Sequence, residues 1–451
     1  MRIRGIMIAI AVITLVILAR CQCAVALGDD PVQNVLNRFQ RETKCKNVSV
    51  VIYNHGEFVY YGDKDVLYQI GSMTKAFTGL AVRKLIQDGM LSEKDALTEF
   101  VPELETYFAS EKVDVTIQNL LEQKSGFTND ERTYPGAAPG ESLADWAKRL
   151  SGRKLNSQPG TEYAYSNVNY NLLGLIIERT SGMTYEEYVK KEILEPLGLG
   201  HTSVGEPMDG DVAEGMRLGY RQTFPFHLPV REASIPAGYF YSSAKDVGRW
   251  MESWMGKGNA SADLEKAMES VKERLAETGD YDSGWERFSD GVIGHSGGTP
   301  NYSSRIVFSV EDQVGVCALT NLNVAASTDS LCNGLFDLVR GKGEGALATD
   351  VWTVFDAAFS VVTALGAILF VAAFWMRRKP LWIGLDLSLV ILLVLTVILL
   401  PIIFGAGLKA ILLTWAPWSL AGGLLTLTVD VLWISLKLWM GKKHAGHNET
   451  K

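Results

Sequence analysis

Three long apolar stretches near the C-terminus constrain this chain more than any other feature of its sequence. They cover residues 351–375, 381–405 and 410–436. Each is longer than the roughly 20 residues that an α-helix needs to cross about 30 Å of hydrocarbon. We therefore predict a three-span transmembrane region over residues 351–451 that ends in a tail, rather than a hairpin of buried helices in a soluble fold.

Basic residues between the apolar stretches predict the orientation of the spans. The segment 377–379 (RRK) separates the first two stretches, Lys442 and Lys443 follow the third, and a lone Lys409 separates the second from the third. Loops rich in Lys and Arg stay in the cytoplasm. The first span then runs from outside to inside. This predicts a multi-pass protein of the cell membrane, with residues 27–350 extracytoplasmic and the C-terminus cytoplasmic.

The N-terminus has the order of a secretory signal peptide. Residues 1–4 are short and basic, residues 6–19 are apolar, and Ala24-Val25-Ala26 resembles a cleavage site. We predict a signal peptide over residues 1–26. Because Arg20 interrupts the approach to the cleavage site, an uncleaved N-terminal anchor remains the alternative. The signal peptide gives the same orientation as the charge pattern of the spans.

Charge and cysteine content exclude several classes of protein. The net charge is −8, and both ends carry more basic than acidic residues, so the middle of the chain is more acidic still. Nucleic-acid binding needs clustered Lys and Arg, and we expect none here. Cys45, Cys317 and Cys332 remain after signal removal, and an odd number indicates no disulfide framework. No metal-ligand spacing occurs, so we expect neither a metal nor a cofactor.

The extracytoplasmic part, residues 27–340, has strand patterns at both ends and a helical middle from about residue 90 to 240. This order predicts an α+β fold. One antiparallel sheet is built from both ends of the domain, flanked by helices, with a helical insertion. A polar, Gly-containing linker, 341–350, follows, so we expect the domain to fold and react without the spans. The strand patterns cover 47–53, 57–61, 304–310 and 314–320.

Ser72 and Lys75 are the first candidate catalytic residues. They open a run with helical spacing that ends at Gly89. Residues three apart share a helix face, so the lysine can activate the serine hydroxyl, and the helix N-terminus favours an oxyanion beside it. The S-x-x-K spacing also occurs at Ser151 and Ser242, and a plain helix-capping serine is the alternative at Ser72.

Tyr165 and Asn167 form a Y-x-N motif just before a helical run. A tyrosine can act as a base when a nearby cation lowers its pKa, and Lys75 is a candidate for that cation. Asn167 can donate to a substrate carbonyl and accept from its amide. The alternative for Tyr165 is a buried aromatic side chain with a satisfied hydroxyl.

The segment His295-Ser296-Gly297-Gly298 precedes the late strands. Glycines let a ligand approach an edge strand closely. The N–H of Gly298 can complete an oxyanion hole with the N–H of Ser72. A structural histidine with satisfied hydrogen bonds is the alternative for His295.

The ordered motifs S-x-x-K, Y-x-N and H-x-G resemble the serine beta-lactamase and penicillin-binding-protein superfamily. The Y-x-N and H-S-G-G forms are most similar to its class C-like and D-aminopeptidase/esterase branch. The resemblance covers roughly residues 30–340 and implies the beta-lactamase/transpeptidase-like form of the α+β fold. Besides the motifs, it extends over residues 115–127, 159–171, 194–203, 236–250 and 295–321.

The resemblance also implies roles for the motif residues. Ser72 attacks a carbonyl and forms an acyl-enzyme, Lys75 and Tyr165 move the proton, and the amides of Ser72 and Gly298 hold the oxyanion. The substrate is positioned by Asn167, His295, Ser296 and Gly297. The family binds no metal.

Two features of the sequence narrow the function. Many relatives have lysine where this chain has His295, and the missing positive charge argues against efficient beta-lactam hydrolysis. A protonated histidine could still pair with a substrate carboxylate. A domain of this kind followed by three membrane spans resembles the architecture of prodrug-activating peptidases. We therefore expect a membrane-anchored serine hydrolase that cleaves an amide in a small peptide containing a D-amino acid, with membrane lipid as its other partner. The alternatives are a beta-lactamase, a DD-carboxypeptidase, an esterase, or a sensing module with little turnover; the sequence leaves the oligomeric state open.

Overall fold

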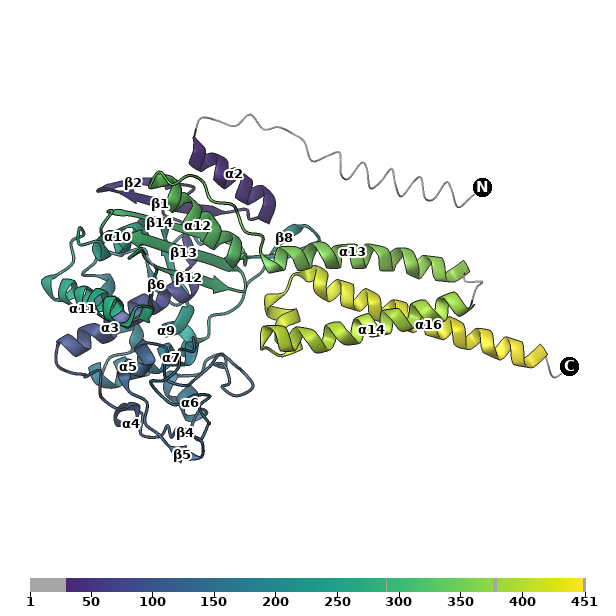
Figure 1. Cartoon of the computed structure of the whole chain (residues 1–451), viewed down its shortest axis with the longest axis horizontal. Helices are drawn as coiled ribbons and strands as arrows, with labels where there is room; N and C mark the ends of the chain where they lie inside the picture. Colours follow the sequence, from purple (N-terminus) through teal and green to yellow (C-terminus); the bar gives the residue numbers. More distant parts are fainter. Residues whose placement is uncertain (1–29, 289, 376–378, 449–451) are drawn as a thin grey trace.

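The computed structural model describes residues 30–288, 290–375 and 379–448. It consists of an α+β domain followed by three long helices that extend away from the domain together (Figure 1). The predicted signal peptide and the basic pair Arg377-Arg378 lie outside the described residues.

A seven-stranded antiparallel sheet forms the centre of the domain, in the order β10-β11-β12-β13-β14-β1-β2. Strand β1 pairs with β14 along its whole length, from Val48 opposite Thr320 to Asn54 opposite Val314. The first and last strands of the domain are therefore neighbours, as the sequence predicted. The strands are β1 (Val48–Asn54), β2 (Glu57–Tyr61), β10 (Tyr281–Asp282), β11 (Trp285–Arg287), β12 (Ile293–Thr299), β13 (Tyr302–Ser309) and β14 (Val314–Thr320).

Helices cover both faces of this sheet (Figure 1). On one face, α2 (Pro31–Thr43) and α12 (Ala325–Val339) bury Phe39 and Leu335 against the strands. Asp30 caps α2 by accepting from the backbone N–H groups of the next turn, and Pro31 fits its first position. The other face carries the larger core, which includes α3 (Thr74–Gln87) and α10 (Ala244–Trp254).

The helical insertion lies on the side of α3. Its helices are α4 (Leu97–Phe100), α5 (Ile117–Leu121), α6 (Leu143–Lys148), α7 (Asn167–Ser181), α8 (Tyr185–Val189), α9 (Ile235–Gly238) and α11 (Ala262–Thr278), with a π-helical turn at Lys190–Leu194 and 3-10 turns at Gly71–Met73 and Glu232–Ser234. Small sheets accompany them: β3 (Leu67–Gln69) with β9 (Phe240–Ser243) and β6 (Ser203–Val204), β4 (Tyr107–Phe108) with β5 (Glu111–Lys112), and β7 (Met216–Gly219) with β8 (Gln222–Pro225).

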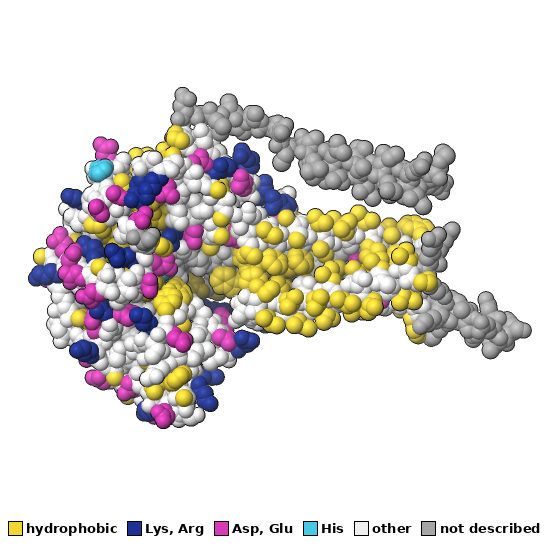
Figure 2. All heavy atoms as spheres, in the orientation of Figure 1, with side chains coloured by type: hydrophobic (Ala, Val, Ile, Leu, Met, Phe, Trp, Pro, Cys, Tyr) yellow, Lys and Arg dark blue, Asp and Glu magenta, His cyan; other side chains and the backbone are white. Residues whose placement is uncertain are grey.

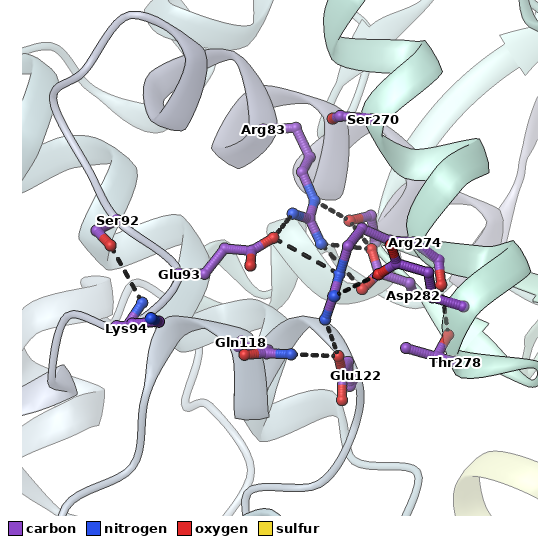
Figure 3. A network of polar contacts seen from close by, with 12 residues as sticks. Arg83, Ser92, Glu93, Lys94, Gln118, Glu122, Ser270, Arg274, Thr278 and Asp282 are labelled. Atoms are coloured by element: carbon purple, nitrogen blue, oxygen red, sulfur yellow. Dashed lines mark hydrogen bonds and ion pairs between the residues drawn. The ribbon is translucent and has the colours of Figure 1, made fainter.

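A buried ion-pair network ties α3 to strand β10 (Figure 3). Arg83 donates to both carboxylate oxygens of Asp282, at 2.7 and 2.9 Å, and to the hydroxyl of Ser283 at 2.9 Å. It also pairs with Glu93. The guanidinium of Arg83 is only 3% exposed and Asp282 is fully buried. This network fixes the turn after β10 against the backbone of α3, close to Lys75.

Replacing Arg83 with methionine is expected to destabilise the domain by about 3–5 kcal/mol, because it leaves the carboxylate of Asp282 buried without its ion-pair partner. Thermal unfolding of the full chain in detergent measures the effect. Arg132→Met is the control, since the Arg132–Asp130 pair is exposed and such pairs contribute little. Similar unfolding midpoints for the two variants would contradict this role of Arg83.

The C-terminal helices are long and apolar enough to cross a membrane over Val351–Trp375, Pro380–Phe404 and Trp418–Met440. Apolar side chains cover their outward surface (Figure 2). The predicted third stretch, 410–436, begins too early: the chain forms a short helix α15 (Leu408–Ala410) and a π-helical turn (Ile411–Trp415) before Pro417. Proline has no N–H to continue a helix, so the third begins after it. The long helices are α13 (Val351–Ala372), α14 (Lys379–Phe404) and α16 (Trp418–Asn448).

Candidate active site

Ser72 and Lys75 meet at the start of α3, as their spacing predicts. Ser72 lies in the 3-10 turn that leads into the helix. The Nζ atom of Lys75 donates to Ser72 Oγ at 3.1 Å and to the carbonyl oxygen of Ala237 at 2.6 Å. Lys75 is fully buried. Ala237 lies in the segment 236–250, which carries part of the family resemblance. Its contact with the lysine is made by the backbone carbonyl, so no pattern of side chains in the sequence could predict it.

The Y-x-N motif reaches the same point from α7. Asn167 Oδ1 accepts from Lys75 Nζ at 2.7 Å, and the ring centre of Tyr165 lies 4.8 Å from that nitrogen. Tyr165 also shares a hydrogen bond with Ser72. Gln123 holds the motif in place, because its Oε1 accepts from the backbone N–H of Ser166 at 3.0 Å. The fold thus brings the two motifs into one hydrogen-bonded group.

Burial changes the proton affinities within this group. It lowers the pKa of Lys75 well below its ordinary value, which favours the neutral amine. It raises the pKa of Tyr165 above its ordinary value, although the hydrogen bond with Ser72 opposes the shift. This direction is opposite to the one expected for a tyrosinate base. The directions of the two pKa shifts therefore favour Lys75 over Tyr165 as the group that accepts the proton of Ser72.

Glycines let the serine turn approach strand β12. Gly71 has a φ of +53°, and a Cβ atom there would lie 2.5 Å from the backbone nitrogen of Gly298. A Cβ atom at Gly297 would likewise clash with the carbonyl oxygen of Ile70. At Gly298 the space beside the Cα is open. The amide of Gly298 therefore lies beside the Ser72 turn, as an oxyanion site formed by these two residues requires.

His295 and Ser296 lie next to this site: the ring centre of His295 is 6.1 Å from that of Tyr165, while the hydroxyl of Ser296 points toward α12. The Nδ1 atom of His295 is 2.6 Å from the carbonyl oxygen of Ser296, and Nε2 is 3.4 Å from the hydroxyl of Tyr281. Burial is the main cause that lowers the pKa of His295 to about 3, so the ring is neutral at physiological pH. The hydroxyl of Ser296 donates to Asp329 at 2.9 Å.

These contacts show how the residues predicted to position the substrate lie relative to the cleft. His295, Ser296 and Gly297 were expected to position the substrate, but among the described residues the cleft is lined by Gly298 and not by those three. A strand alternates its side chains between two faces, so His295 points into the core and Ser296 points toward α12. The role of His295, Ser296 and Gly297 in positioning the substrate stays a prediction.

A cleft of about 350 Å³ opens over Ser72. Its catalytic-domain wall includes Asn167, Gly298 and Arg231. Further lining residues come from the C-terminal helical region, and the reactivity of the domain without that region stays a prediction. A larger hollow of about 1070 Å³ lies along residues 194–211 and includes none of the candidate residues. The residues that the membrane region contributes to the cleft are Phe404, Gly405, Ala406 and Trp415.

Comparison with known families now decides the class of protein. Residues 32–335 match the beta-lactamase family model. The chain belongs to the beta-lactamase family. This family, together with the hydrogen-bonded serine and lysine, makes the protein a serine hydrolase. The three apolar helices after the family domain fit a membrane anchor.

Individual relatives agree with this assignment. Protein flp of Staphylococcus aureus (strain COL) is 28% identical over 386 residues, covering 80% of this chain and 77% of that protein. A beta-lactamase of Yersinia enterocolitica is 26% identical over 349 residues, covering 65% of this chain and 86% of the relative.

Solved structures share the fold. The octameric penicillin-binding protein homologue from Pyrococcus abyssi has a TM-score of 0.57 and 25% identity, covering 69% of this chain and 77% of that chain. A class C beta-lactamase in complex with cefoxitin has a TM-score of 0.55 and 19% identity, covering 65% of this chain and 93% of that chain. The predicted beta-lactamase/transpeptidase-like fold is confirmed.

The other serines with S-x-x-K spacing in this family member lie away from the site. Ser151 follows α6, and its hydroxyl accepts from the backbone N–H of Glu105. Ser242 is buried in β9 beside Thr202, at 2.9 Å between hydroxyls. The neighbouring Ser243 caps α10, because its hydroxyl accepts from the N–H of Asp246.

Proposed function

We propose that this protein is an extracytoplasmic, membrane-anchored serine hydrolase that forms an acyl-enzyme on Ser72. Its substrate is an amide, in a small peptide that contains a D-amino acid. The observation that carries the proposal is the contact of Lys75 Nζ with Ser72 Oγ at 3.1 Å inside a cleft of the beta-lactamase family fold.

Acylation follows from the proton affinities of the group. The neutral amine of Lys75 takes the proton of Ser72 as Oγ attacks the substrate carbonyl. The amides of Ser72 and Gly298 stabilise the oxyanion of the tetrahedral intermediate. When the C–N bond breaks, the departing amine takes a proton from the hydroxyl of Tyr165, which Lys75 then reprotonates. The acyl group remains bonded to Ser72.

Deacylation uses the same residues in reverse. A water molecule loses a proton to the Lys75–Tyr165 pair as its oxygen attacks the acyl carbonyl, and the proton returns to Ser72 Oγ when the ester bond breaks. Asn167, held by Lys75, faces the cleft and positions the substrate amide. Neither step needs a metal or a cofactor.

The neutral His295 supports a peptidase more than a beta-lactamase. It offers no positive charge to a substrate carboxylate. Arg231 lines the cleft instead, and its Nη1 donates to the carbonyl of Ala137 at 3.0 Å. Beta-lactamase, DD-carboxypeptidase and esterase activity remain the alternatives within the same chemistry. A sensor that is acylated without useful turnover is the alternative from another class.

A time course with fluorescent penicillin and a panel of D-aminoacyl amides tests the proposal. A hydrolase is expected to release product from at least one D-aminoacyl amide and to lose the penicillin label with time. A stable label together with no turnover of any amide would identify the sensor. The absence of any acylation, checked by intact mass, would contradict the assignment of Ser72.

The orientation in the membrane is a separate part of the proposal. We infer a cleaved signal over residues 1–26, a catalytic domain outside the cell and a cytoplasmic tail, with membrane lipid as a partner and no nucleic acid. The charge argument supports it, because Lys442 and Lys443 follow the third span while a lone Lys409 lies in the turn between the second and third.

Single cysteines at Lys342, Gly407 and Gly446 test this topology with an impermeant thiol reagent. The first two are expected to label in intact cells, and the third only after permeabilisation. The background lacks Cys21 and Cys23, and Cys45, Cys317 and Cys332 are buried. Labelling of Gly446→Cys in intact cells would place the tail outside and contradict an odd number of spans.

A further inference from the structure

The turn between the second and third membrane helices forms one wall of the cleft over Ser72. This segment, residues 404–417, is called the membrane turn below. Phe404 is both the last residue of the second candidate span and a lining residue of the cleft. Gly405, Ala406 and Trp415 complete that wall. The reacting serine and the end of a membrane-spanning helix therefore open onto the same space.

A buried arginine of the catalytic domain holds the membrane turn in place. Arg217, on β7, is 2% exposed. Its guanidinium donates to the carbonyl oxygens of Ala416, Leu413 and Leu412, at 2.6, 2.8 and 2.5 Å. It also lies 3.9 Å from the ring centre of Trp418. Because these carbonyls end the π-helical turn, the arginine satisfies acceptors that the backbone leaves free.

A second contact docks the same hairpin into the helices. The backbone N–H of Arg221, at the tip between β7 and β8, donates to Asp356 of α13 at 2.8 Å. The other carboxylate oxygen of Asp356 accepts from Ser419 of α16 at 2.7 Å. The hairpin is thus fixed to the membrane turn by Arg217 and to α13 and α16 by Asp356, and the membrane turn is a structural wall of the site.

Apolar surface continues from the outside of the helices into the cleft. Ile402 and Ile403, just before the membrane turn, are 68% and 66% exposed. Apolar side chains cover the visible surface of the long helices (Figure 2). Phe404, Ala406 and Trp415 continue this surface to the site. Tryptophan favours the level of the lipid headgroups.

We propose that the cleft takes an amphiphilic substrate, whose apolar chain lies along the membrane turn while its scissile carbonyl lies at Ser72. The inference rests on the proposed hydrolase function. Burial of a chain against Phe404 and Trp415 removes apolar surface from water, and the gain grows with each methylene. The polar part of the substrate lies against the catalytic domain, near Asn167 and Arg231.

Chain-length dependence of ester hydrolysis tests the proposal with the full chain in lipid nanodiscs. One series varies the acyl side, from p-nitrophenyl acetate to p-nitrophenyl dodecanoate. The other varies the leaving side, from the ethyl to the dodecyl ester of D-alanine. The measured quantity is the ratio of kcat/KM between the long and the short member of each series. We expect a ratio well above one in at least one series.

Two variants should lower this ratio by about tenfold or more, since two or three buried methylenes account for such a factor. Trp415→Ser removes part of the wall, and Ala406→Trp fills the space beside it. Trp375→Ser is the control, because Trp375 is 73% exposed at the opposite end of the first span. Comparing variants in the same nanodiscs cancels the partition of long chains into lipid.

The outcomes separate this proposal from the one on which it rests. A short-chain fluorophosphonate reports independently whether Ser72 is nucleophilic. Labelling of Ser72 without a long-chain preference in either series would overturn the amphiphilic substrate alone. So would a preference that survives both Trp415→Ser and Ala406→Trp. If Ser72 is not labelled and no ester reacts, the hydrolase function fails and this inference fails with it.

Discussion

Replacing Ser72 with alanine is expected to abolish covalent labelling of the protein by fluorophosphonate and penicillin probes. Ser72 Oγ is the hydroxyl that Lys75 Nζ contacts at 3.1 Å, and alanine leaves no atom to form the ester. Fluorescence in a denaturing gel, with intact mass spectrometry, measures the loss. Labelling should fall below detection, since no other group replaces the nucleophile.

The chain supplies two matched controls for this experiment. Ser151→Ala and Ser242→Ala remove serines with the same S-x-x-K spacing, one in an exposed turn and one buried beside Thr202. Both variants should keep the label. Full labelling of Ser72→Ala would assign the nucleophile to another residue.

Replacing Lys75 with methionine or Tyr165 with phenylalanine is expected to slow acylation by about 10²-fold or more, the scale of general acid–base catalysis. Both residues contact Ser72 and lie within one group. The double variant should lose much less than the product of the single losses, because either change already breaks the shared proton path. Stopped-flow acylation with a chromogenic ester measures the three rates.

The pH dependence gives a second readout for Lys75. Burial lowers its pKa, and the neutral amine is the active form. The acylation rate of the unmodified protein should therefore fall as the pH drops through that pKa, and Lys75→Met should lose this pH dependence.

Tyr163→Phe is the control for Tyr165→Phe, since Tyr163 is exposed and precedes the motif. Fully multiplicative losses in the double variant would contradict a shared proton path.

Periodic patterns predicted the parts of the fold whose burial is simple. The strands at 57–61 and 314–320 are found with the predicted bounds. Shorter elements were missed, because a strand of three residues such as β3 shows no alternation. The amphipathic helix α2 was not predicted either, although Asp30 and Pro31 are a capping signal.

The candidate site was predictable where the reacting side chains belong to a short motif, S-x-x-K or Y-x-N. Ser72, Lys75, Tyr165 and Asn167 come together as expected. The neutral state of His295 was not predictable from a motif, because the burial that lowers its pKa comes from the surrounding fold. Trp415 was hidden within an apolar stretch that composition alone assigns to the membrane.

The docking of β7 and β8 onto the helices has a practical consequence for inhibitor discovery. A secreted fragment that ends in the linker would lose the carbonyls and the Trp418 ring that hold Arg217, and with them the wall formed by Phe404 and Trp415. Compounds selected on such a fragment would be optimised for a groove with one open side. Potency rankings from it would be biased toward small polar molecules, so chemical screens belong on the full-length chain in a bilayer mimetic.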